Sequence, residues 1–256
     1  MTATDAARLV LLAAIWGASF LFVRIAAPVI GPVATADLRM LIAGAALLAY
    51  YAVTGFDAQW RLRWRQYLAI GVLNSAVPFL LYAYAALELS VGLLAVLNAT
   101  SPMWAALLGI VALREALTKR RLAGLIVGMA GVAIVSGPEA STRWGHGAPA
   151  RGMAVGTQLT GGLLLLPLLA ISPPGNITPG VAGAMLALGV VCGALAYVLY
   201  FRLVADIGAT GALTVTYLIP LFGILWGALA LGEALTAARV LGAIVVTLGT
   251  VLVLRG

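Results

Sequence analysis

The sequence predicts an all-α membrane protein: a polytopic helical bundle of about nine transmembrane helices, built from an inverted five-helix repeat with one helix missing in the second half. Three observations lead to this prediction. The 256 residues are 63% hydrophobic and 9% charged, and their mean hydropathy is +1.11. Apolar stretches of about 20 residues, the length that crosses a bilayer, follow one another along the chain. A segment of the first half recurs in the second half.

The composition excludes a water-soluble fold, because a soluble domain has about 25% charged residues. The formal net charge of +7 does not indicate a nucleic-acid partner, because the basic residues lie mostly in short loops, where the positive-inside rule accounts for them. The expected partner is the lipid bilayer. Arg8 precedes the first apolar run, but no cleavage site and soluble domain follow, so this run is predicted to be the first spanning helix.

The predicted helices cover residues 8–28, 34–54, 66–87, 91–113, 121–137, 153–172, 180–204, 209–231 and 237–254. The first five lie in a first repeat at residues 1–137, a polar loop follows at 138–152, and the last four lie in a second repeat at 153–256. The 30 glycines allow helices to approach closely, as bundles in lipid require.

The duplication is clearest in two heptapeptides. Ala112–Thr118 reads ALREALT and Ala230–Thr236 reads ALGEALT, at an offset of 118 residues. From Pro102–Val135 to Pro220–Val253, 15 of 34 positions are identical, including proline, glutamate, threonine, arginine and glycine positions. Because matches of these residue types are rare by chance in apolar sequence, we interpret the pattern as an internal repeat.

The basic residues predict the orientation of the first half. They lie between predicted helices 2 and 3 and between helices 4 and 5, whereas the loop between helices 3 and 4 carries Glu88. This places the N-terminus in the cytoplasm. In the second copy, Arg239 alone remains of the cluster that follows ALREALT, as expected if the two halves have opposite orientations. The basic residues of the first half are Arg61, Arg63, Arg65, Arg114, Lys119, Arg120 and Arg121.

Several of these features together resemble the EamA-type branch of the drug/metabolite transporter superfamily. They are WGASF at residues 16–20, Leu38 and Arg39 at the second helix, and the paired proline and E-x-L-T boundary in both halves. The resemblance implies two five-helix repeats with both termini in the cytoplasm. It also implies a multi-pass protein of the cell membrane that transports amino-acid-like or drug-like metabolites.

The chain departs from the family pattern in its second half. Trp16 precedes Arg39 by 23 residues, and Gln158 resembles the counterpart of Arg39, but counting 23 residues back reaches Val135 in the fifth helix. The sixth of the family's ten helices is therefore predicted to be missing. If the remaining helices keep the family orientation, the polar loop has to pass the level of the membrane. If they do not, the C-terminus lies outside.

The candidate substrate site consists of polar and aromatic residues near the two helix prolines. The asparagines Asn74 and Asn98 are expected to face the bundle interior, because an unpaired amide in lipid is costly. The alternative role of the tyrosines is an interfacial belt. The candidates are Trp16, Ser19, Asn74, Tyr82, Asn98, Thr100, Tyr197, Thr216 and Tyr217.

Pro102 and Pro220 are candidates for kinks or gating elements, because a proline inside a helix removes one backbone hydrogen bond. Matching interrupted helices in two repeats point to a binding site, and a simple packing kink is the alternative. Glu115 and Glu233 are gating candidates as well. The other reading gives them a structural role, in which they satisfy free amides at a helix start or bind an arginine.

The sequence predicts a transporter or exporter of small organic metabolites that works by alternating access, and no enzyme. Catalytic residues, metal ligands and cofactors are not expected, because the one histidine, His146, lies in a polar loop and the one cysteine is Cys192. The acidic residues lie near predicted helix ends, so a central carboxylate for proton coupling is not evident. The alternative function is a non-transporting, inactive remnant or scaffold. A homodimer could supply the missing wall.

Overall fold

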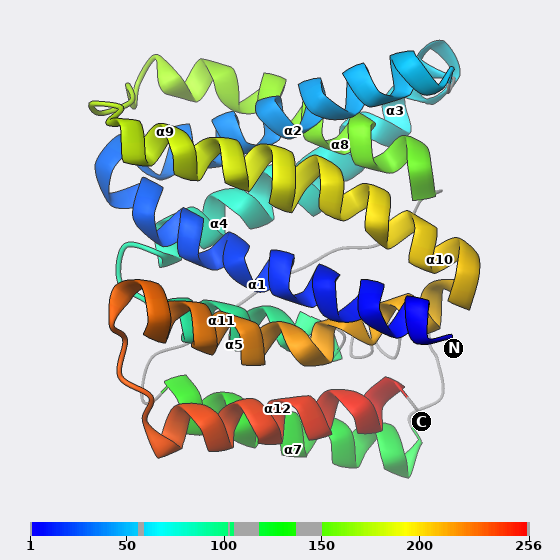
Figure 1. The fold of residues 1–256 in the computed structure, drawn as a ribbon, viewed down its shortest axis with the longest axis vertical. Helices are drawn as coiled ribbons and strands as arrows, with labels where there is room; N and C mark the ends of the chain where they lie inside the picture. The colour runs from blue at the N-terminus through cyan, green and yellow to red at the C-terminus, as the bar shows by residue number, and fades with distance from the viewer. Residues whose placement is uncertain (1, 56–58, 102, 105–117, 137–149, 255–256) are drawn as a thin grey trace.

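The computed structural model describes residues 2–55, 59–101, 103–104, 118–136 and 150–254. Long helices lie nearly parallel to one another in a flat stack (Figure 1). Many large apolar side chains, among them Leu11, Leu163 and Leu248, are exposed on its outside, as expected for contact with lipid. The helices are α1 (Ala3–Ile30), α2 (Pro32–Thr54), α3 (Trp60–Ile70), α4 (Val77–Ala85), α5 (Val91–Ala99), α7 (Lys119–Ser136), α8 (Ala150–Leu169), α9 (Pro179–Leu186), α10 (Ala196–Leu213), α11 (Val215–Leu231) and α12 (Ala237–Leu254).

Two π-helical segments connect α-helices into longer spans. η1 (Gly71–Ala76) lies between α3 and α4, and η2 (Ala187–Leu195) lies between α9 and α10. Adding 118 to the bounds of η1 gives 189–194, which falls inside η2. The two halves therefore carry the same rare winding at matching positions, and π-helical turns are frequent at functional sites.

The helix bounds follow the predicted spans closely. Five helical stretches among the described residues are long and apolar enough to cross a membrane: Ala3–Ile30, Pro32–Thr54, Leu62–Ala85, Pro179–Gly208 and Gly211–Leu231. α7, α8 and α12 occupy the predicted spans at 121–137, 153–172 and 237–254. The predicted span at 91–113 is described only in part, through α5. The chain is thus a polytopic helical membrane protein.

The internal repeat is visible in how matching helices pack. Adding 118 to the bounds of α7 gives 237–254, the bounds of α12. These two helices are in close contact through glycines: a β-carbon added at Gly131 would lie 2.6 Å from the backbone nitrogen of Val246, and one added at Gly249 would lie 2.5 Å from the Cα of Gly128. Residue numbers rise along one helix as they fall along the other, so the matching helices run antiparallel, as an inverted repeat requires.

Helix α1 has no such counterpart among the described residues. Adding 118 to its bounds gives 121–148, a range that α7 and the undescribed residues 137–149 already fill. Consistent with a missing helix, α7 and α8 follow each other in the chain yet run in the same direction (Figure 1). The ends of α7 and α8 that residues 137–149 connect therefore lie at opposite ends of the bundle.

Both ends of the chain lie at the same end of the bundle (Figure 1). Of the two topologies that the sequence left open, this is the one in which the helices keep the family orientation. The polar loop at 138–152 falls mostly outside the described residues. An extended chain gains about 3.3–3.6 Å per residue, so 13 residues reach roughly 45 Å, enough to join the two ends of a 20-residue helix about 30 Å long.

Candidate functional site

An aromatic cluster occupies the space between α1, α4 and α10. The ring of Trp16 lies 6.2 Å from that of Tyr197 and 5.4 Å from that of Tyr200, measured between centroids. On the next turn of α1, Phe20 lies 5.5 Å from Tyr82 of α4 in an edge-to-face arrangement. These rings are buried or half-buried. Because Tyr200 and Tyr82 occupy matching positions at the offset of 118, each repeat contributes one tyrosine to the same α1 surface.

Asn98 joins this cluster through Tyr82. The Tyr82 hydroxyl donates a hydrogen bond of 3.0 Å to Oδ1 of Asn98 on α5. The Ser101 hydroxyl donates a 2.6 Å bond to the backbone carbonyl of Asn98, the carbonyl that Pro102 leaves without its helical donor. The expectation that Asn98 faces the interior and is paired is therefore confirmed.

Arg39 of α2 extends into the bundle beside the same tyrosines. Its side chain is 8% exposed, and its guanidinium carbon lies 3.8 Å from the centroid of the Phe79 ring. Tyr82, Cys192 and Tyr197 lie within electrostatic range of the guanidinium group. A cation above an aromatic face is stabilised by the ring quadrupole, so Phe79 orients Arg39 without neutralising it.

Three of the predicted site residues bond mainly to backbone carbonyls three positions earlier in the chain. The hydroxyl of Ser19 donates to the carbonyl of Trp16 at 2.7 Å, that of Thr100 to Leu97 at 2.7 Å, and that of Thr216 to Leu213 at 2.8 Å. Ser19 and Thr100 are buried. Such local bonds satisfy a hydroxyl in an apolar bundle. Tyr217 is half-buried on α11.

The expectation that Asn74 faces the bundle interior is wrong. Its side chain lies on η1 and is exposed. The matching residue of the second repeat is Cys192 (adding 118 to 74), which is 1% exposed and donates a 3.2 Å bond to the carbonyl of Ile15 on α1. In the second repeat this face is covered by α1. The described residues contain no counterpart of α1 that could cover Asn74.

Glu233 stabilises the start of α5. Its Oε1 accepts a 2.8 Å hydrogen bond from the backbone nitrogen of Val91, and Oε2 accepts a 3.5 Å bond from that of Gly92. Arg239 lies 3.9 Å from the same carboxylate. The carboxylate therefore satisfies free amides at a helix N-terminus, where negative charge is favoured, and these are the contacts expected from a structural role of Glu233.

The other predicted kink and gating residues are described in part. Pro220 is buried inside α11, which runs without interruption from Val215 to Leu231. Pro102 and Glu115 lie outside the described residues. The register of the repeat also corrects one sequence comparison. Adding 118 to 40 gives 158, so Gln158 matches Met40 and not Arg39. The side chains of Gln158 and Met40 are both fully buried.

Sequence reasoning overlooked Asp37. Its side chain is 0% exposed, and neither carboxylate oxygen has a hydrogen-bond partner among the described residues. Within the same part of the chain, the side chains of Gln158 and Ser75 are also buried without partners for their polar atoms. The available signal was the Asp37-Leu38-Arg39 tripeptide at the start of an apolar stretch, because ionisable residues in membrane helices usually have a function.

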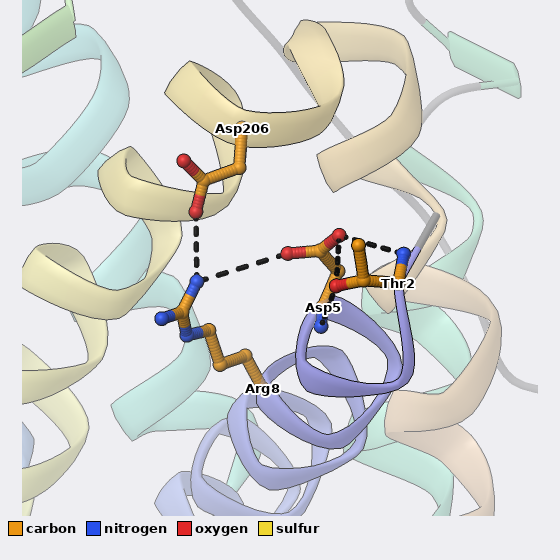
Figure 2. A network of polar contacts seen from close by, with 4 residues as sticks. All are labelled: Thr2, Asp5, Arg8 and Asp206. Atoms are coloured by element: carbon orange, nitrogen blue, oxygen red, sulfur yellow. Dashed lines mark hydrogen bonds and ion pairs between the residues drawn. The ribbon is translucent and has the colours of Figure 1, made fainter.

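A polar network holds α1 to α10 at the end of the bundle where both termini lie (Figure 2). The Thr2 backbone and hydroxyl donate to the Asp5 carboxylate at 2.8 and 2.7 Å, forming a capping box with the reciprocal bond from the Asp5 amide. The guanidinium group of Arg8 lies 2.7 Å from the Asp206 carboxylate and 3.7 Å from that of Asp5. This network thus bridges the first turns of α1 and the later part of α10.

Comparisons with known proteins agree with this architecture. The chain is 24% identical to an uncharacterized transporter of Archaeoglobus fulgidus, covering 94% of this chain and 95% of that protein. It is 24% identical to protein PecM of Dickeya dadantii, over 90% of this chain and 85% of PecM, and 26% identical to a WAT1-related chloroplastic protein of Arabidopsis thaliana, over 93% and 66%.

A solved crystal structure shares the fold, with a TM-score of 0.64 at 16% identity and coverage of 98% and 96% of the two chains. The model of the EamA-like transporter family matches this sequence twice, at residues 6–137 and 145–255. These two matches span nearly the whole chain. The chain therefore belongs to the EamA-like transporter family.

Proposed function

We propose that this protein moves a small organic solute across the membrane by alternating access, with the solute bound between Trp16, Tyr82, Asn98 and Tyr197. The observation that carries the proposal is the Tyr82–Asn98 pair beside the aromatic rings of α1 and α10. Binding sites for small molecules combine apolar and aromatic walls with a few polar groups that fix orientation. Inverted-repeat transporters bind their substrate where the repeats meet, and these residues come from both repeats.

We further propose that the protein lies in the cytoplasmic membrane with both termini in the cytoplasm. The end of the bundle that holds the termini also holds the starts of α1, α3 and α7 (Figure 1). These starts carry seven of the 15 basic residues, and the positive-inside rule favours such a cluster on a cytoplasmic face: Arg8, Arg61, Arg63, Arg65, Lys119, Arg120 and Arg121.

The site is tested by comparing two asparagine variants in reconstituted vesicles. Vesicles are loaded with radiolabelled amino acids, and efflux is measured. Asn98→Leu is expected to abolish flux, because it removes the acceptor of the Tyr82 hydroxyl and a polar group of the cluster. Asn74→Leu is the matched control, since its side chain is exposed and outside the cluster, and it should retain flux.

Both variants have to insert and purify as the wild type does for the comparison to count. Wild-type flux that Asn98→Leu leaves unchanged would remove Asn98 from the site. The alternative function, a remnant that no longer transports, predicts that the wild type moves neither amino acids nor a drug-like solute such as ethidium.

A further inference from the structure

Arg39 is a buried cation that lacks an anionic partner among the described residues. It is 8% exposed, and its Nε has no hydrogen-bond partner. The ion pairs within the described part of the chain join Arg8 to Asp5 and Asp206, and Arg239 to Glu233. An arginine stays protonated in proteins, so this site holds a full positive charge inside an apolar bundle.

The nearest acidic residue in the sequence does not neutralise this charge. Asp37 precedes Arg39 by two residues on the same helix, and residues at this spacing do not face each other. Both carboxylate oxygens of Asp37 are buried without a partner, so the two side chains are not paired. Buried charges in proteins are normally paired, and the environment of Arg39 therefore lacks one negative group.

The surroundings of Arg39 limit what that group can be. Phe79 lies under the guanidinium plane at 3.8 Å, and Tyr82 and Tyr197 lie within its electrostatic range. Tyr82 also contacts Phe20, and Tyr197 contacts Trp16. The charged group thus adjoins the aromatic cluster proposed as the solute site. An anion here would sit beside apolar and aromatic walls, with a single cation available to it.

We infer that Arg39 binds the carboxylate of the transported solute, and that the solute is a small monocarboxylate with an apolar or aromatic body. The planar guanidinium fork matches a carboxylate with two parallel hydrogen bonds, and the aromatic cluster accommodates the body. One positive charge balances one carboxylate. This inference rests on the proposed function, because it gives the solute of the same site its chemical class.

The inference is tested with three ligands that share one skeleton and differ in their head groups: 3-phenylpropanoate, 3-phenylpropan-1-ol and 3-phenylpropylamine. Binding to the purified protein is measured by tryptophan fluorescence and by thermal shift. Hydrogen bonds to charged groups contribute about 1.5–3 kcal/mol, so the carboxylate should bind about 10–100-fold more tightly than the alcohol. The amine should bind most weakly. Inorganic phosphate alone should not compete, because it lacks the apolar body.

Two substitutions assign any carboxylate preference to Arg39. Arg39→Gln should weaken binding of 3-phenylpropanoate about tenfold or more and leave the affinity for 3-phenylpropan-1-ol unchanged. Arg39→Lys keeps the charge but loses the planar fork, so it should retain part of the preference even if the glutamine variant does not fold. Arg24→Gln is the matched control. Arg24 contacts the carbonyl of Leu87 at 3.4 Å outside the cluster, and its loss should leave the preference intact.

Equal binding of the three ligands by the wild type would overturn the inference, and so would a carboxylate preference that survives in Arg39→Gln. Failure of the two proposals can be told apart by flux in vesicles. If the wild type transports only neutral or cationic solutes, the proposed transport function is supported and the proposed carboxylate site is contradicted. If 3-phenylpropanoate binds through Arg39 but no solute crosses the membrane, the carboxylate-binding site is supported and the proposed transport function is contradicted.

Discussion

At the scale of single residues, three different environments occur among the ionisable side chains that the structure describes. Glu233 accepts hydrogen bonds from backbone amides at the start of α5. Arg8 and Asp206 form an ion pair at an exposed end of the bundle. Asp37 and Arg39 are buried without ionic partners among the described residues. An exposed ion pair contributes about 0–1 kcal/mol. Burying an unpaired charged group costs considerably more. Asp37 and Arg39 are therefore expected to lower the free energy of unfolding.

The burial of Asp37 predicts that replacing it will stabilise the protein. Asp37→Asn keeps the shape of the side chain and removes a carboxylate that has no partner among the described residues. The free energy of unfolding should rise by about 1–3 kcal/mol, because a neutral amide, although still unpaired, costs less to bury than an unpaired carboxylate. The melting temperature in detergent at pH 8 measures this change.

Asp206→Asn is the control for Asp37→Asn. The Asp206 carboxylate is exposed and pairs with Arg8, so its loss should leave the melting temperature nearly unchanged or slightly lower. A lower melting temperature for Asp37→Asn would mean that the carboxylate has a stabilising partner in the folded protein.

At the scale of helices, the spans were predictable from the sequence because hydropathy depends only on local composition. The π-helical windings of η1 and η2 were not, because nothing in Gly71–Ala76 distinguishes a π turn from an α turn. The exposure of Asn74 could not be predicted either. It depends on which face α1 covers, and α1 lies on the Cys192 face of η2. A residue's own sequence neighbours do not contain that information.

The same limit applied to the site. The candidate residues could be named from the sequence, because tyrosine, asparagine and tryptophan stand out in an apolar chain. The Tyr82–Asn98 bond joins residues 16 positions apart in the sequence, and it forms only because the bundle brings these side chains of α4 and α5 together. Arg39 was noticed only through the family resemblance. Its lack of a partner becomes visible only once the neighbouring helices are in place.

The packing of α1 on α11 predicts a sensitive glycine. A β-carbon added at Gly17 would lie 2.7 Å from the Cβ of Phe222 and 3.0 Å from the backbone nitrogen of Gly223. Gly17→Ala should therefore force the helices apart and lower the free energy of unfolding by about 1–3 kcal/mol. Thermal unfolding in detergent checks this value.

Gly183→Ala on α9 is the matched control, because a β-carbon there meets nothing within 4 Å. Alanine is also the better helix former by about 1 kcal/mol, so the control should be neutral or stabilising. If Gly17→Ala behaves like the control, α1 and α11 are less closely packed than this structure shows.

At the scale of the whole molecule, the positions of the two termini predict a labelling pattern. α12 ends at the same end of the bundle as the N-terminus (Figure 1). A Gly256→Cys variant in intact cells should react with an impermeant thiol reagent only after the membrane is permeabilised. The native Cys192 should not interfere, because it is 1% exposed.

The Ile177→Cys variant is expected to show the opposite labelling behaviour to Gly256→Cys. Ile177 is 54% exposed and lies two residues before α9. Helix α9 begins at the far end of the bundle from the termini (Figure 1). The variant should react with the reagent in intact cells. Labelling at position 256 but not at 177 in intact cells would mean that the protein is inserted the other way round.

The matched π-helical segments affect how the bundle can rearrange. In an α-helix each residue advances the chain by about 100° around the axis, since a turn holds 3.6 residues, whereas a π turn is wider. Rewinding η1 as α-helix would therefore rotate α4 relative to α3 and move Tyr82 away from Asn98. The same rewinding of η2 would rotate Tyr197 and Tyr200 away from Trp16. Each repeat thus places a π-helical segment, whose winding sets the orientation of the next helix, before the aromatic residues that it contributes to the cluster.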